Sequence, residues 1–97
     1  MATLYIAEYA ATAGDIPIAL AAPIAEQTVA IGGSSTQSAA FDPATVFVRV
    51  HSDAICSIAF GANPTATAAK QRLSADQTEY FGIKPSSATK IAVITNT

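Results

Sequence analysis

The sequence predicts an all-β fold: a two-layer antiparallel β-sandwich of about eight short strands, with the jelly roll among its candidate topologies. Apolar and polar residues alternate with period two along most of the chain, whereas a sustained period of 3.6 is nearly absent. Gly, Pro, Asp and Ser clusters divide the alternating segments at intervals of about 8–12 residues. The chain has 97 residues, the length of one domain, so we expect residues 1–97 to form a single sandwich.

The N-terminal half contains two clear strand candidates, residues 3–9 and 25–31. A shorter candidate, residues 37–41, ends at an Asp-Pro pair. Residues 16–22 are apolar, but Pro17 cannot donate a ladder hydrogen bond, which restricts them to a sheet edge or an extended segment. Within the single domain, residues 1–24 are therefore a candidate arm or edge segment.

The C-terminal half contains two pairs of strand candidates. Residues 46–51 and 54–60 are separated by Ser52-Asp53, and a two-residue polar connection predicts a hairpin. Residues 78–83 and 90–95 form the second pair, with a turn at Pro85 between them. The alternation predicts a core made of one face of these strands: Val46, Val48, Val50, Cys56, Ile58, Phe60 and one of Tyr80 and Phe81.

The helix candidate of the chain is residues 66–73, where Ala66, Ala69 and Leu73 would lie roughly on one helical face.

Composition excludes several classes of function. The net charge of −2 argues against a nucleic-acid partner, because phosphate binding requires clustered Lys and Arg. A single cysteine, Cys56, excludes an internal disulfide and a cysteine zinc site. The apolar run at residues 16–22 is too short to span a bilayer, and no basic residue precedes it as in a signal peptide. We therefore expect synthesis in the cytoplasm and no membrane partner.

No residue combination predicts catalysis. His51, Ser52 and Asp53 are the residue types of a hydrolase triad, but consecutive strand residues point to opposite faces. His51 and Asp53 together make at most half of a metal site. Cys56 alternates with Ile58, so a buried, unreactive thiol is expected. We expect no enzyme activity, no catalytic residue, no cofactor and no metal.

Several large apolar residues fall on faces opposite the predicted core. Phe47 opposes the valines of its strand, Ile55 opposes Cys56, and Tyr80 and Phe81 must point to different faces. Either the N-terminal segment covers them or they form a subunit interface. The candidate interface residues are Phe47, Ile55, Ile16, Ile18 and Tyr80.

Charge is divided unevenly along the chain. Residues 1–48 carry four acidic and no basic residues, a balance of −4, and residues 49–97 carry five basic and three acidic residues, a balance of +2. The two halves can attract each other within one subunit, or between neighbouring copies in a closed ring. We expect the second arrangement, and a homo-oligomer.

The segments 48–66, 72–83 and 90–94 resemble small virion proteins of tailed phages, of the capsid cement or head-decoration kind. The resemblance covers residues 46–95. It implies a β-sandwich on the capsid exterior, often a trimer, which binds the major capsid protein and bridges neighbouring capsomers. It transfers no functional residues, because such proteins act through surfaces.

The alternative is a tail- or fibre-associated virion sandwich with a binding role, such as carbohydrate affinity. The absence of Trp and the small number of Phe and Tyr argue against this alternative.

Overall fold

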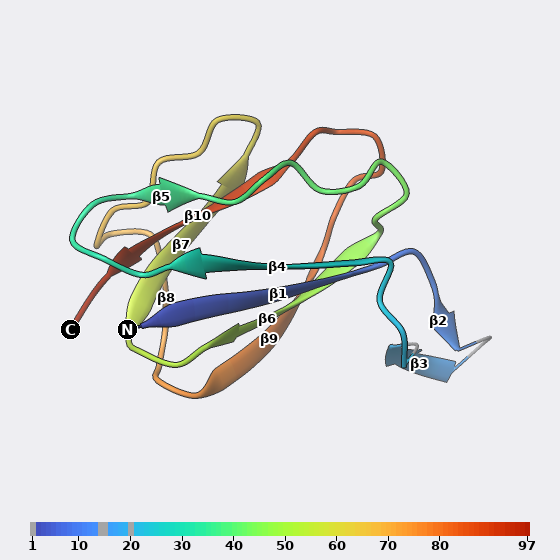
Figure 1. Cartoon of the computed structure of the whole chain (residues 1–97), viewed down its shortest axis with the longest axis horizontal. Coiled ribbons are helices and arrows are strands. Elements are labelled where there is room, and N and C mark those ends of the chain that lie inside the picture. Colours follow the sequence, from blue (N-terminus) through green and yellow to red (C-terminus); the bar gives the residue numbers. More distant parts are fainter. Residues whose placement is uncertain (1, 14–15, 20) are drawn as a thin grey trace.

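The protein is a two-layer β-sandwich, as predicted (Figure 1). The computed structural model describes residues 2–13, 16–19 and 21–97, and the side chains of residues 13–20 are not described. In chain order the strands are β1 (Thr3–Tyr9), β2 (Thr12–Ala13), β3 (Ile16–Ala19), β4 (Ala25–Ala30), β5 (Thr36–Gln37), β6 (Phe47–Ser52), β7 (Cys56–Gly61), β8 (Gln71–Leu73), β9 (Gln77–Gly82) and β10 (Lys90–Thr95). One sheet has the order β4-β1-β6-β9 and the other β5-β10-β7-β8, and all pairs are antiparallel.

The topology is a jelly roll in which the last strand has moved to the front of the chain. Counted from β4 to β10 and then β1, the eight strands stand in the two sheets as 1-8-3-6 and 2-7-4-5, the order of a jelly roll. Such a permutation requires the two termini to lie at one end of the sandwich (Figure 1). They do, because two adjacent residues bond to the two ends of the chain. Ile31 N donates a hydrogen bond to the Ala2 carbonyl (3.0 Å), and the Gly32 carbonyl accepts one from Thr95 N (2.9 Å).

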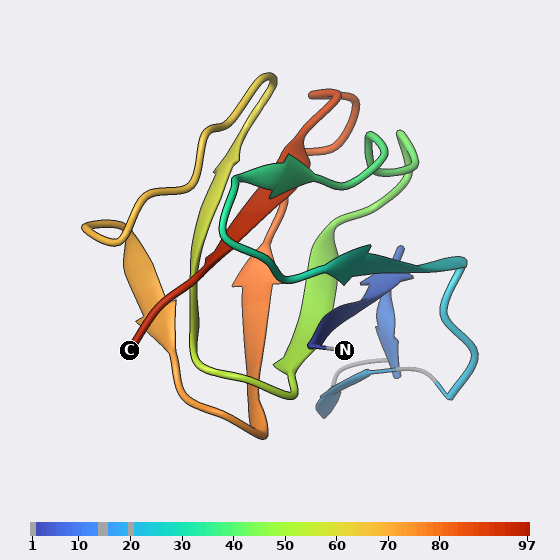
Figure 2. The same ribbon diagram turned by 60° about the vertical axis from the view of Figure 1, so that its left-hand side comes forward.

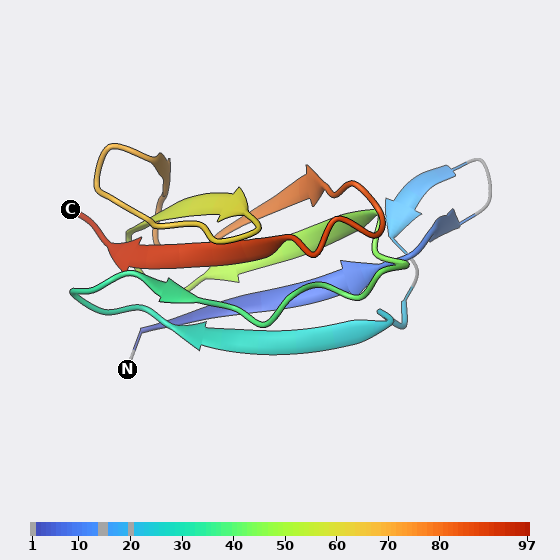
Figure 3. The same cartoon turned by 90° about the horizontal axis from the view of Figure 1, so that it is seen from above.

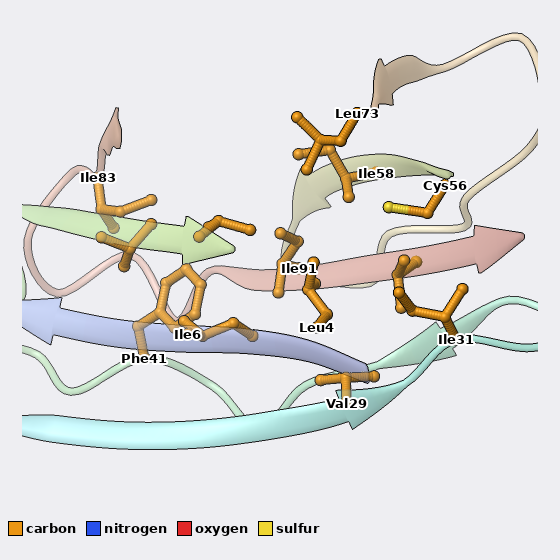
Figure 4. Close-up of a cluster of buried hydrophobic side chains, with 13 residues drawn as sticks. Leu4, Ile6, Val29, Ile31, Phe41, Cys56, Ile58, Leu73, Ile83 and Ile91 are labelled. Carbon is orange, nitrogen blue, oxygen red and sulfur yellow. The ribbon is translucent and has the colours of Figure 1, made fainter. Parts of the chain in front are cut away.

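The core consists of aliphatic side chains from the inner faces of both sheets (Figure 4). From the first sheet, Leu4, Ile6, Val48 and Val50 are at most 2% exposed. From the second sheet, the fully buried members are Cys56, Ile58, Leu73, Ile91 and Val93. Phe60 and Phe81 lie at the margin of this cluster, with ring centroids 4.9 Å apart. Of the predicted Tyr80/Phe81 pair, Phe81 is therefore the inner residue.

One buried position on the inner face is a carboxylate. Glu8 is 3% exposed, and its Oε1 accepts hydrogen bonds from Asp42 N (2.7 Å) and Thr45 Oγ1 (2.9 Å). Its Oε2 faces Gln27 Nε2 at 3.4 Å. Glu8 thus ties the segment before β6 to β1 and β4, and these donors compensate the cost of its burial.

The hairpin predicted at Ser52-Asp53 and the pairing predicted for the last two strands are both wrong, because each of the two connections crosses from one sheet to the other (Figure 2). β6 pairs with β1 and β9, whereas β7 pairs with β10 and β8. β9 and β10 are likewise in opposite sheets. Alternation identifies the apolar face of each strand, which packs against the opposite sheet. It does not identify the neighbouring strands within the same sheet. The turn at Pro85 is present, with Ser86 at a φ of 59°.

Two further local predictions are corrected. Residues 66–73 form no helix: Ala66 is buried in a segment without regular secondary structure, and Leu73 enters the core from β8, opposite Cys56. Val46 is 37% exposed, because it precedes the first residue of β6 at the end of the sandwich.

Residues 1–24 divide into two parts. Residues 3–9 are a central strand, β1, between β4 and β6, and not an arm or edge segment, because Leu4 and Ile6 fill the core. β2 and β3 pair with each other as a ribbon that projects beyond one end of the sandwich (Figure 3). Pro17 lies in this ribbon, whose two strands have no other partner strand in the described part of the chain.

Candidate functional site

The outer face of the β4-β1-β6-β9 sheet gathers the tyrosines of the protein. The chain has three tyrosines, Tyr5, Tyr9 and Tyr80, and all three lie at outward-facing positions of this sheet. Phe47, Arg49 and the single histidine, His51, occupy the outward positions of β6 between them. The inner positions of β1 and β6 are aliphatic apart from Glu8 and Ser52, so on these two strands the alternation separates aliphatic from aromatic side chains.

The strand register arranges these side chains in rows. In one row Thr28, Tyr5, His51 and Thr78 are neighbours across the four strands, and in the next Glu26, Ala7, Arg49 and Tyr80. In the third row Tyr9 lies opposite Phe47. Directly opposed side chains on one face lie about 5 Å apart at Cβ, so each row is a line of contacts.

An apolar stripe, defined as Ile24, Tyr9, Phe47 and Tyr80, crosses one end of this face. The rings of Tyr9 and Phe47 stack at 4.9 Å with an interplanar angle of 9°, and Phe47 and Tyr80 are tilted at 6.3 Å. Ile24 N donates to Glu8 O (2.8 Å), which places Ile24 beside the end of β1. Ile24 and Tyr80 are 46% and 56% exposed. Tyr9 is only 8% exposed and Phe47 is half-buried, so the exposed apolar surface of the stripe comes mainly from Ile24 and Tyr80.

Next to the stripe lies a hollow centred on Ala7. Ala7 is small and is flanked along β1 by Tyr5 and Tyr9 and across the sheet by Glu26 and Arg49. Together with neighbouring residues, Ala21 and Pro23 among them, these four side chains line an open groove of about 710 Å³. Its volume is within the range of small-molecule sites, about 300–1,000 Å³.

His51 borders the hollow but is held by its own strand neighbours. Its Nδ1 is 2.8 Å from Thr78 Oγ1, and its Nε2 is 3.9 Å from Asp76 Oδ1. The ring of Tyr5 lies 6.3 Å away on the other side. These contacts fix the orientation of the His51 ring, with the Thr78 hydroxyl at one ring nitrogen and the Asp76 carboxylate near the other.

The residues that resemble a catalytic triad are separated, as alternation requires. Ser52 points inward and is fully buried; its hydroxyl donates a hydrogen bond to the Ala54 carbonyl and lies 3.5 Å from the Ser74 carbonyl. Asp53 Oδ1 accepts from Thr3 N (2.7 Å) and so joins the β6–β7 connection to β1. Cys56 is buried as predicted; burial raises the pKa of its thiol, a hydrogen bond with Ser52 opposes that rise, and the Asp53 charge adds to it.

Two of the predicted interface residues are brought together, and the others are not. Phe47 and Tyr80 are neighbours in the apolar stripe. Ile55 lies in the β6–β7 connection, half-buried, and its carbonyl accepts from Asn96 N (3.1 Å), so it belongs to a different surface. Ile16 and Ile18 are in β3, but their side chains lie outside the described residues.

Sequence reasoning did not single out Tyr5, Ala7, Tyr9, Glu26 or Arg49. A signal was present: Tyr5, Ala7 and Tyr9 occupy alternate positions of one strand, opposite the buried Leu4 and Ile6. The contributions of Glu26 and Arg49 depend on which strands flank β1, and periodicity carries no information on strand order.

Within residues 2–13, 16–19 and 21–97, no group of three or more His, Cys, Asp or Glu residues is placed to hold a metal ion. The described part of the chain also contains no helix that would cross a membrane. Comparison of the chain with protein-family models, with curated protein sequences and with solved structures finds no match.

Proposed function

We propose that the protein is a structural component of a tailed-phage virion, a cement or decoration protein on the capsid exterior. It binds the major capsid protein and bridges neighbouring capsomers, and it acts as a homo-oligomer, most simply a trimer. It requires no catalysis, cofactor, nucleic acid or membrane, and it is made in the cytoplasm of the bacterial host. The resemblance of residues 46–95 to such proteins and the small β-sandwich both support this proposal.

The apolar stripe is the observation that carries the proposal. An aromatic and aliphatic line across an outer sheet face costs solubility unless another surface covers it. With charged residues at only 12% of the chain, little on the surface repels a neighbour. We infer that the stripe packs against a second copy of the chain.

The charge division favours a head-to-tail contact between copies. β1 and β4, from the acidic half, lie in one sheet with β6 and β9, from the basic half. Within the described residues, however, the one contact between a histidine and a carboxylate, His51 with Asp76 at 3.9 Å, lies inside the basic half, and no ion pair joins the two halves. The opposite charges of the two halves thus remain for contacts between subunits, where they orient the encounter while apolar burial supplies the affinity.

Co-sedimentation tests the proposal, with heads and tails separated from the phage that encodes the chain. We expect the wild-type protein to sediment with expanded heads, and its mass in solution to exceed that of one chain. Tyr80→Ser removes an exposed ring from the stripe and is expected to weaken self-association about tenfold or more. Gln71→Ser, an exposed and uncharged change on β8 of the other sheet, is the control.

Two outcomes contradict the proposal. Absence of the chain from the purified virion excludes a structural role. Virion density in which no copy contacts another copy of the chain excludes the stripe as the contact between copies. Self-association of Tyr80→Ser equal to that of the wild type excludes it as well.

The alternative location, on a tail or fibre, is favoured by one observation, the hollow at Ala7, because fibre proteins bind ligands on the host surface. Sedimentation of the protein with tails and not with heads would establish this location.

A further inference from the structure

The hollow at Ala7 is a preformed cavity on an otherwise continuous sheet face. Strands in a sheet lie about 4.8 Å apart, so Glu26 and Arg49, each one strand away from Ala7, are separated by roughly 10 Å at their backbones. Along β1, Tyr5 and Tyr9 each lie roughly 7 Å from Ala7. A methyl side chain at the centre of four larger ones leaves an opening with a polar group on two sides and a ring on the other two.

Two charged groups of the hollow, Glu26 and Arg49, have no partners within the described residues. Within the described part of the chain, neither Glu26 nor Arg49 makes a hydrogen bond or ion pair, although Arg49 is half-buried. No ion pair joins the two side chains across β1. The hollow therefore presents an unpaired guanidinium and an unpaired carboxylate to whatever occupies it.

The ring of Tyr5 supplies the apolar part of the site. It is 46% exposed, and its contact with the His51 ring fixes its position from one side. His51 is itself held by Thr78 Oγ1. A rigid, half-exposed aromatic ring beside planar hydrogen-bonding groups is a surface with one apolar face and several fixed polar contacts.

We propose that this hollow binds a neutral saccharide. The C–H face of a sugar ring packs against Tyr5, while adjacent hydroxyls donate to the Glu26 carboxylate and accept from the Arg49 guanidinium. Both groups are planar and present two atoms each, which matches pairs of neighbouring hydroxyls. Opposite charges on the two sides balance, so the site favours an uncharged ligand.

Other ligand classes fit the hollow less well. An anionic ligand gains from Arg49 but is repelled by Glu26 across the same opening. A nucleic acid requires several cations along one face, and the outer positions of this sheet carry one arginine and a histidine paired with Asp76. A sugar satisfies both unpaired groups at once.

This inference goes beyond the proposed function and does not depend on it, because the test uses the isolated protein. The wild-type chain is applied to an array of neutral and acidic oligosaccharides, and the strongest free oligosaccharide is then titrated with detection by NMR. We expect neutral oligosaccharides to bind, with shifts confined to the hollow. Tyr5→Ala and Arg49→Gln should each weaken the dissociation constant about tenfold or more, whereas the same substitution elsewhere, Arg72→Gln, leaves it unchanged.

Each other outcome overturns the proposal. No binding across the array, or shifts located on another surface, means that the hollow is not a sugar site. Binding of acidic oligosaccharides alone identifies an anion site at Arg49. Equal weakening by Arg72→Gln indicates a non-specific charge effect. Wild-type backbone spectra of each variant establish that the fold is retained.

Discussion

The two faces of the β4-β1-β6-β9 sheet are built from the same strands but from different chemistry. On β1 the inner positions, Leu4 and Ile6, are at most 2% exposed, whereas the outer Tyr5 between them is 46% exposed. On β6 the inner valines alternate with Phe47, Arg49 and His51. The inner face determines whether the chain folds, and the outer face presents the stripe and the hollow. Because alternate residues carry the two roles, substitutions one position apart should have different effects.

The largest difference is expected between two adjacent residues of β1. Ile6→Ala removes a buried side chain between the sheets and should lower the free energy of unfolding by about 2–5 kcal/mol. Tyr5→Ser, one position away on the outer face, should change it by about 0.5 kcal/mol or less. Denaturant titration of both variants measures the difference. Equal losses would show that the outer face also belongs to the folding core.

A smaller difference is expected between two glutamates. Glu8→Ala leaves the Asp42 amide and the Thr45 hydroxyl without their acceptor in a buried place, and should cost about 1–3 kcal/mol. Glu26→Ala, on the outer face, should be nearly neutral for stability. Unfolding midpoints of the two variants provide the comparison. A neutral Glu8→Ala would mean that the segment before β6 is held by other contacts.

The smallest effect concerns the pH dependence of stability. Cys56, on the inner face of the second sheet, should contribute to it. Burial raises the pKa of the thiol in the folded state, so the unfolded chain loses this proton at lower pH than the folded chain. Stability should therefore fall as the pH rises above the ordinary thiol pKa of about 8.5, by no more than about 1.4 kcal/mol per pH unit.

Cys56→Ala should remove this decrease of stability with pH between pH 8 and 9.5, roughly the range below the pH at which tyrosine and lysine side chains titrate. Thermal or denaturant unfolding at several pH values in this range measures the free energy of unfolding of both proteins. Native protein should also react with a thiol reagent only as fast as it opens. Immediate labelling, or the same slope in Cys56→Ala, would contradict the assignment of Cys56 to the core.

The sequence by itself determined the all-β class, the position of most strands and which face of each is apolar. These properties depend on alternation, and alternation is local: Val48 and Val50, or Cys56 and Ile58, mark a buried face whatever lies opposite. Leu73 was misassigned to a helix because a three-residue strand is too short for its period to be recognised.

Only the tertiary structure decided which strands are neighbours. An apolar face packs against the opposite sheet whichever strands flank it, so the alternation could not show whether β6 and β7 are neighbours in one sheet or belong to different sheets. The strand order of the first sheet also placed β1 between β4 and β6. Ala7 thereby came between Glu26 and Arg49, and Tyr9 came against Phe47, from segments far apart in the chain. The hollow and the stripe exist because of strand order, and strand order depends on how two layers close around one core.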